Sequence, residues 1–318
     1  MNREINNIAA DPLTSSGFRD ASATDIGIDR AINEDRFAVV SSKSGSAWFV
    51  LDGMGGVSGG EFAAQLAIDA MRRYVEGHDC APPADILSGA VSEGNRAVVI
   101  RRQNQKFSSM GTAVVALMID EMEVAISNVG DSRAYLVHKD GITQLTVDDT
   151  LVQQMVDAGP LRADEALTHP DAHFLTRCLG TDANLTFPTH RFWRVDGKDS
   201  DTIVLCTDGL YGLVSDLEIG EVVRSHTPER ACQKLIALAN ERGGYDNITV
   251  SVVPLDGVLV DEPPANWDVI LAQRARRRAK LNKPPLSMVT HAFILGSLAM
   301  LSAVMTVVIF GIQQSLIS

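Results

Sequence analysis

The sequence is poor in aromatic residues and in cysteine. Aromatic residues make up 5% of its 318 residues, against 45% hydrophobic and 21% charged, so we expect a globular protein with an aliphatic core. The cysteines form no CxxC pair and have no histidine at a zinc-binding spacing. They are Cys80, Cys178, Cys206 and Cys232. We interpret them as reduced, structural thiols in a cytosolic compartment.

The N-terminus lacks a secretion signal, and the body of the chain lacks the basic charge that binds nucleic acid. The opening residues MNREINNIAADPLTSSG contain no apolar core, so we interpret residues 1–19 as a flexible leader. Residues 1–273 contain 22 basic and all 40 acidic residues, a formal charge of −18. This charge argues against nonspecific nucleic-acid binding and is compatible with a carboxylate-rich metal site.

The C-terminal segment has no charged residue after Lys283. Residues 288–312 are an apolar run of 25 residues whose polar members are Thr, His and Ser, and about 20 such residues span a membrane. The preceding basic cluster RARRRAKLNK predicts a transmembrane helix over 287–313 with its N-terminal side in the cytoplasm. We therefore expect a single-pass protein of the inner (cytoplasmic) membrane, with a linker at 256–286 and a tail at 314–318. The alternative is a buried core helix.

Short β-branched runs separated by Gly, Asp or Asn predict antiparallel strands. Strands are expected at 37–42, 47–52, 112–119, 123–130, 133–139, 202–208 and 248–255, with hairpin turns at Asp120-Glu121 and Asp140-Gly141. Amphipathic patterns predict helices at 58–76, 84–103 and 229–242. Because helices and strands come in blocks, the expected fold class is α+β. The polar segment 146–190 is interpreted as a mobile flap of short helices.

Four aspartates stand where predicted strands end or begin. Asp52 and Asp208 directly follow apolar runs and precede glycine. Asp131 lies in the turn of NVGDSRAY, and Asp246 comes just before a strand. Each alone is explained by turn formation, because Asp-Gly is a common turn dipeptide. If the four converge, their mutual repulsion must be neutralised, which divalent cations with oxygen ligands do.

A fifth stretch, DRAINEDRF, places two adjacent carboxylates, Glu34 and Asp35, before a predicted strand. Arg30 lies four residues before Glu34. The planar arginine fork binds phosphate oxygens in a bidentate manner, so an arginine beside a metal cluster would suit a phosphate ester. The alternative is a surface ion pair between Arg30 and a neighbouring carboxylate.

An ordered set of motifs now identifies a family. The motifs are DRAINEDRF, LDGMGGVSGGE, MGTAVVAL, NVGDSRAY, LTRCLG, LCTDGLYGLVSD and YDNITV, and they extend over residues 20–255. Together they resemble the metal-dependent serine/threonine protein phosphatases of the 2C type, particularly bacterial members. The resemblance implies a four-layer α-β-β-α sandwich of two antiparallel sheets flanked by helices. It also implies hydrolysis of phosphoserine and phosphothreonine by a water that bridges two Mn²⁺ or Mg²⁺ ions, without a phosphoenzyme.

The resemblance also implies roles for individual residues. The implied metal ligands are Glu34, Asp52, Gly53, Asp131, Asp208 and Asp246. Asp52 would bridge the two ions, the Gly53 carbonyl would bind one of them, and Glu34 would act on the other mostly through water. Asp131 would share a third, weaker ion with Asp208. Arg30 matches the phosphate-binding arginine, so Arg30, Asp52 and Asp208 are expected to carry catalysis.

Other positions are expected to support this site or depart from the family. Asp35 and Asn247 are expected beside the ligands rather than on the ions. Met54 stands where eukaryotic members have a histidine proposed as general acid, and methionine has no proton to donate. The proton must then come from metal-bound water or another group. We expect neither His169 nor His173 of the flap to supply it, because flap histidines usually face solvent.

Two other functions compete with a phosphatase. One is a membrane-tethered pseudophosphatase that binds phosphoproteins or a kinase without catalysis, although degenerate members usually lose carboxylates that this sequence keeps. The other is a metal-dependent nuclease, which the charge of −18 disfavours. The expected partners are therefore phosphorylated proteins, a cognate serine/threonine kinase and the membrane, and no nucleic acid.

Overall fold

The computed structural model describes part of the chain. The described ranges are residues 19–55, 59–78, 81–197 and 199–265. The chain divides into two units, Met1–Pro264 and Ala265–Ser318, and all described elements belong to the first. The predicted transmembrane helix and tail, nearly all of the leader and most of the linker lie outside the described residues. Within the described ranges, no helix has the length and apolar character needed to cross a membrane.

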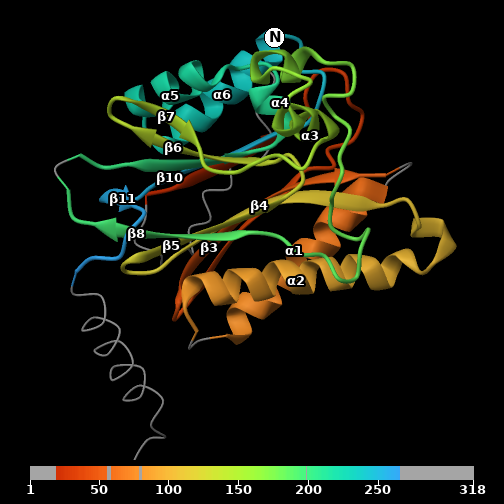
Figure 1. The fold of residues 1–318 in the computed structure, drawn as a ribbon, viewed down its shortest axis with the longest axis horizontal. Helices are drawn as coiled ribbons and strands as arrows, with labels where there is room; N and C mark the ends of the chain where they lie inside the picture. Colours follow the sequence, from red (N-terminus) through yellow and green to blue (C-terminus); the bar gives the residue numbers. More distant parts are fainter. Residues whose placement is uncertain (1–18, 56–58, 79–80, 198, 266–318) are drawn as a thin grey trace, which may run out of the picture. The chain divides into compact units, whose positions relative to one another are not determined.

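Two antiparallel sheets form the centre of the described domain (Figure 1). The five-stranded sheet has the order β1 (Ala21–Asp25), β10 (Ile248–Pro254), β9 (Thr202–Cys206), β6 (Arg133–His138) and β7 (Gly141–Gln144). The six-stranded sheet has the order β11 (Val258–Val260), β8 (Thr189–Val195), β5 (Glu123–Val129), β4 (Gly111–Ile119), β3 (Gly45–Met54) and β2 (Arg36–Ser42). Strands far apart in the sequence are therefore neighbours, and they bring loops from both halves of the domain together.

Helices cover the outer face of each sheet (Figure 1). The six-stranded sheet packs against α1 (Gly59–Gly77) and α2 (Pro83–Arg102). The five-stranded sheet packs against α4 (Asp208–Tyr211), α5 (Asp216–Ser225) and α6 (Pro228–Glu241). The remaining described helices are α3 (Leu151–Ala158) and the 3₁₀ segments Gln105–Phe107 and Ala163–Thr168. The predicted four-layer α-β-β-α sandwich is thus confirmed for the described residues.

Strand β3 shows why its sequence is almost uniformly apolar. Side chains alternate between the two faces of a strand. Trp48 and Val50 lie in the core between the two sheets, whereas Phe49 and Leu51 lie in the core under α1 and α2. Both faces are buried in a four-layer sandwich, so a continuous apolar run replaces the alternation of a half-exposed strand.

The sequence located most strands of both sheets but missed three of them. Each of the predicted strand ranges overlaps an observed strand, whereas β1, β8 and β11 were not predicted. The predicted domain boundary at residue 255 lies before β11, which continues the six-stranded sheet by pairing with β8. Leu259 of β11 is 8% exposed, and its N–H donates to the buried carboxylate of Asp201 at 2.9 Å. A three-residue edge strand has too little pattern to be recognised from sequence.

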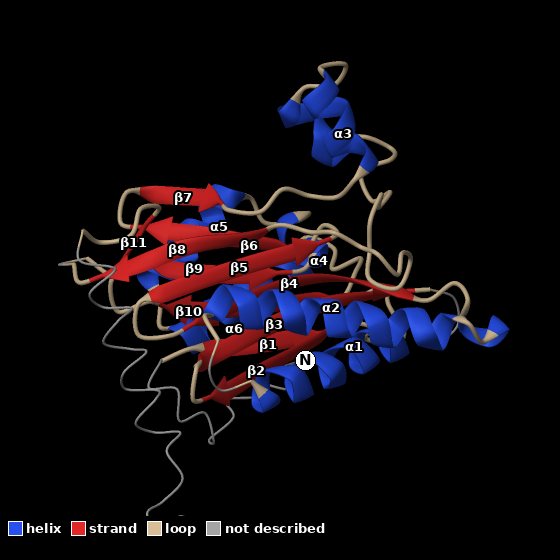
Figure 2. Cartoon of the chain, turned by 60° about the horizontal axis from the view of Figure 1, so that its bottom comes forward, coloured by secondary structure: helices blue, strands red, loops and turns tan. Residues whose placement is uncertain are grey.

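The predicted flap lies between β7 and β8 and contains α3, which stands away from the sheets (Figure 2). Helix α3 begins with the Thr150 hydroxyl accepting from the Gln153 N–H and ends at Gly159 in the left-handed conformation. Within the flap, an antiparallel bridge between Thr150 and Leu175 joins the segments that precede and follow α3 and the Ala163–Thr168 3₁₀ segment. The flap is therefore a separate lobe on a narrow base.

Candidate metal centre

A cavity of about 1000 Å³ gathers residues from six separate segments of the chain. They come from the loop before β2, the end of β3, the turn between β5 and β6, the flap, the start of α4 and the loop before β10. The predicted site residues that line it are Arg30, Glu34, Asp52, Gly53, Asp131, Asp208, Asp246 and Asn247. Carboxylates separated by up to 212 positions in sequence, from Glu34 to Asp246, therefore share one cavity.

The alternation along β3 places Asp52 on the side of the other sheet. Asp52 lies two residues after Val50 and four after Trp48, so its side chain is on the same face of the strand as theirs, which lies between the sheets. Its backbone carbonyl accepts from the Thr112 hydroxyl at 2.8 Å. The next residue, Gly53, packs so closely on α1 that a Cβ there would lie 2.2 Å from the Gly60 carbonyl oxygen. The strand end is thus fixed, and only glycine fits beside Asp52.

The carboxylates of the cavity interact strongly with each other. Burial raises the pKa of Asp52 well above its usual range, and the negative charges of Asp35, Asp208 and Asp131 raise it further. Burial also raises the pKa of Asp131, with Asp208 adding to the effect. A cluster of like charges in a low-dielectric site disfavours ionisation of its members. The cavity therefore favours any cation that relieves this repulsion.

Asp35 lies behind the cavity rather than in its lining. Its side chain is 1% exposed, and one oxygen accepts from the hydroxyls of Thr207 at 2.9 Å and Thr249 at 2.7 Å. Burial raises its pKa to about 7, although the two hydroxyls oppose the shift. Asp35, which was predicted to lie beside the ligands, thus ties the start of β2 to β10 and to the residue after β9.

Asn247 fastens the loop that contains Arg30 and Glu34. Its side-chain oxygen accepts from the Glu34 N–H at 2.8 Å, and its NH₂ group donates to the carbonyls of Ile26 and Ile32 at 2.9 and 3.0 Å. All three bonds reach backbone groups, so Asn247 shapes the loop. The Glu34 side chain in turn accepts from the Gly60 N–H at 3.1 Å.

Arg30 is the one predicted site residue that carries a positive charge. Its Nη2 donates to Asp246 at 2.7 Å, and its Nε donates to the Tyr245 carbonyl at 3.4 Å. The side chain of Arg30 is 46% exposed at the mouth of the cavity. Arg30 therefore pairs with Asp246 rather than with a carboxylate near it in sequence, and the pair lies at the cavity, where the guanidinium can also meet an incoming anion.

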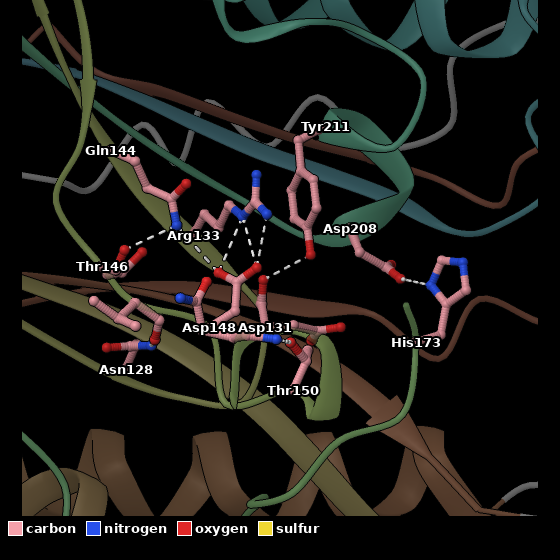
Figure 3. Close-up of polar contacts among 12 residues, drawn as sticks. Asn128, Asp131, Arg133, Gln144, Thr146, Asp148, Thr150, His173, Asp208 and Tyr211 are labelled. Atoms are coloured by element: carbon pink, nitrogen blue, oxygen red, sulfur yellow. Dashed lines mark hydrogen bonds and ion pairs between the residues drawn. The ribbon is translucent and has the colours of Figure 1, made fainter. Parts of the chain in front are cut away.

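The two flap histidines differ in position. The Nδ1 of His173 lies 3.2 Å from an Asp208 oxygen, and the side chain points toward that carboxylate (Figure 3). The hydrogen bond to Asp208 is the main cause of a raised His173 pKa. His169 instead accepts from the N–H of Asp171, within the flap. The His173 side chain is 64% exposed, so it faces solvent as expected and reaches Asp208 as well.

The donor set fits hard divalent cations. Carboxylate and carbonyl oxygens are the ligands that Mg²⁺ and related ions prefer. One oxygen of Asp208 is buried with no hydrogen-bond partner in the described structure, so it is available as a ligand. Among the described residues, no three acidic, histidine or cysteine side chains already converge on one point as metal ligands do. The other oxygen of Asp208 contacts His173, and Asp246 pairs with Arg30.

Sequence reasoning missed the polar network that anchors the flap. Arg133 donates to both oxygens of Asp148, at 2.7 to 3.0 Å, and stacks 3.7 Å from the centre of the Tyr211 ring (Figure 3). Asp149 accepts from the Gly130 N–H at 3.0 Å and from the Arg177 Nε at 2.9 Å. The Asp148-Asp149 pair, which follows β7, was the sequence feature that could have predicted this network, but such a pair is equally typical of a polar loop.

The comparisons with known proteins give the class to which this fold and cavity belong. Residues 28–239 match the family described as Protein phosphatase 2C. The chain belongs to the protein phosphatase 2C family.

Particular relatives show how far the similarity extends. The serine/threonine phosphatase stp of Listeria innocua is 33% identical over 237 residues, covering 72% of this chain and 93% of that protein. The crystal structure of the Mycobacterium tuberculosis serine/threonine phosphatase PstP/Ppp is 33% identical, with a TM-score of 0.68 over 75% of this chain and 99% of that one. The PstP catalytic domain in complex with two manganese ions is 32% identical, with a TM-score of 0.66 over 77% and 99%.

Proposed function

We propose that this chain is a metal-dependent protein serine/threonine phosphatase. The observation that carries the proposal is the shared cavity of Glu34, Asp52, Asp131, Asp208 and Asp246, with Arg30 at its mouth. The named activity of the relatives and the two manganese ions of the PstP catalytic domain support it. The six residues predicted as ligands would hold two Mn²⁺ or Mg²⁺ ions, with Asp131 placed to share a third with Asp208.

Bound divalent ions would supply charge neutralisation and a water more acidic than bulk water. The chain's own residues would do the rest. Arg30 is exposed enough to turn from Asp246 to the phosphoryl oxygens, which its fork binds in a bidentate manner. Asn247 and Gly60 hold the Glu34 loop in place, and Thr112 holds the backbone of Asp52. No residue of the cavity needs to form a covalent intermediate.

The activity is tested with the full-length chain and a phosphothreonine peptide. We expect phosphate release that requires Mn²⁺ and stops with EDTA. Replacing a residue that only hydrogen-bonds to a metal ligand costs roughly 10–100-fold in activity. Asp52 is predicted to bind the ions itself, so Asp52→Asn should reduce the rate by more than this. Asp69→Asn, on the outer surface of α1, is the matched control and should retain the rate. Mn²⁺ binding without phosphate release would instead identify a pseudophosphatase.

We also propose that the chain is anchored in the inner (cytoplasmic) membrane by residues 288–312, with the phosphatase domain in the cytoplasm. The support is the absence of charge after Lys283 and the basic cluster before the apolar run. Anchoring would restrict the enzyme to phosphoproteins near the membrane, a cognate serine/threonine kinase among them. The full-length chain should resist carbonate extraction from membranes, whereas an Ala299→Arg/Val304→Arg variant should be released.

A further inference from the structure

A second, smaller cavity adjoins the metal centre beneath the flap. Its volume is about 60 Å³, and it shares His173, Asp208 and Tyr245 with the large cavity. The small cavity, called the side pocket below, lies between the flap and the start of α4–α5: Val152, Ala166, Leu167 and Ala172 line it from the flap, and Tyr211 and Gly212 from the other side. A group bound at the metal centre is therefore next to an opening into the flap.

Two charged groups in the wall of the side pocket, Arg133 and Asp148, are paired with each other, and the unpaired oxygen of a third, Asp208, is assigned to the metal ions by the proposed function. Arg133 and Asp148 form a bidentate ion pair, and Gln144 donates to Asp148 at 3.1 Å. The Thr150 hydroxyl accepts from the Gln153 N–H at 3.2 Å. A charged occupant would find little left to pair with and would lose its hydration, which is costly. The side pocket therefore suits an apolar group.

Exposed apolar side chains gather around the two adjacent cavities. In the described part of the chain, nine large hydrophobic side chains are more than a third exposed. Four of them line these cavities: Ile32, Leu167, Phe174 and Tyr245. Exposed apolar groups that are concentrated in one place mark a binding surface, whereas single apolar residues scattered over a surface are normal.

We infer that the side pocket receives a small aliphatic side chain of the substrate, one or two residues from the phosphorylated residue. This inference rests on the proposed phosphatase function. The pocket has room for about two water molecules, which is the scale of a valine or leucine side chain rather than an aromatic ring. The pocket shares His173, Asp208 and Tyr245 with the cavity that would hold the phosphate, so it lies within reach of a neighbouring side chain of the same peptide. The acidic cavity also disfavours acidic residues beside the phosphorylated one.

The test measures kcat/KM of the full-length chain with Mn²⁺ on a series of phosphothreonine peptides. The peptides are neutral to basic and identical except that Ala, Val, Leu or Glu stands at one of the two positions on either side of phosphothreonine. At one position we expect Val or Leu to exceed Ala by about 10-fold, the scale on which an apolar pocket discriminates methylene groups. Para-nitrophenyl phosphate, which has no neighbouring residue, is the reference substrate.

Two flap variants locate the preference in the side pocket. Ala166→Leu fills the pocket and should remove the advantage of the Val or Leu peptide over the Ala peptide. Leu167→Ala enlarges the pocket and should shift the preference to larger side chains, a gain that a misfolded flap cannot produce. Leu217→Ala on α5, which is 71% exposed and outside both cavities, is the control and should keep the wild-type preference.

Each result separates the inference from the proposed function. Equal kcat/KM for Ala, Val and Leu at all four positions, or an unchanged preference in both flap variants, would overturn the inference and leave the phosphatase function intact. No hydrolysis of any peptide or of para-nitrophenyl phosphate would overturn the proposed function, and the inference with it.

Discussion

The backbone of Gly53, at the end of β3, lies against the backbone of Gly60, in the first turn of α1. A Cβ on Gly53 would lie 2.2 Å from the Gly60 carbonyl oxygen, and a Cβ on Gly60 would lie 2.5 Å from that of Gly53. Real Cβ atoms do not approach other atoms so closely, so neither position has room for a side chain. This contact fixes the carbonyl of Gly53 and, through the Gly60 N–H, the carboxylate of Glu34.

Gly60→Ala should therefore destabilise the protein, by about 1–3 kcal/mol on the scale of overpacked sites. Gly77→Ala, at the other end of α1, is the matched control because a Cβ there meets nothing within 4 Å. Glycine is less favourable than alanine in a helix, so the control should be neutral or slightly stabilising. Urea unfolding of the two variants checks the prediction, and equal free energies of unfolding would contradict it.

Mn²⁺ should stabilise the wild-type protein against heat, because an ion that binds only the folded state raises its stability. The gain is about 2.7 kcal/mol at a concentration of 100 times the Kd. Asp208→Asn should reduce the shift of the melting temperature, and Asp69→Asn should leave it unchanged. This measurement does not depend on turnover. A full shift in Asp208→Asn would show that its carboxylate does not bind the ion.

Asp149 should control how often the flap opens. It binds the Gly130 N–H and Arg177, and hydrogen bonds to charged groups each contribute about 1.5–3 kcal/mol. Asp149→Ala should therefore speed amide hydrogen exchange in α3 by at least about 10-fold. Asp157→Ala, which removes only an exposed bond from Gln153 within α3, should change exchange by less than about three-fold. Equal exchange in the two variants would mean that other contacts hold the flap.

Glu123 should make stability depend on pH. Burial raises the pKa of this carboxyl above its usual value, although the Ala84 N–H and Arg191 oppose the shift. A group with a raised folded-state pKa contributes stability below its unfolded pKa and loses that contribution as pH rises through the folded value. Glu123→Gln should therefore gain stability relative to wild type as pH rises above about 4.5, the usual value. Chemical unfolding from pH 4 to 8 measures the difference, and a constant difference would contradict the prediction.

The sequence predicted the strands that carry the site, because their local pattern is strong. The runs at β3, β4, β9 and β10 are long and apolar, and each is bounded by Gly, Asp or Asn. The edge strand β11 has three residues and no pattern of its own, so only its pairing with β8 reveals it. The fold class thus follows from these strands and does not depend on the three that were missed.

The sequence by itself determined that aspartates beside glycines stand at strand ends and that Arg30 precedes Glu34 and Asp35. It also determined that no charged residue follows Lys283. Only the tertiary structure decided that Glu34 and Asp246 share one cavity, that His173 reaches Asp208, and that a side pocket opens beneath the flap. The physical reason is that a local sequence pattern depends only on residues that are close together in the chain. Distances between remote side chains are set by how two sheets and their helices pack.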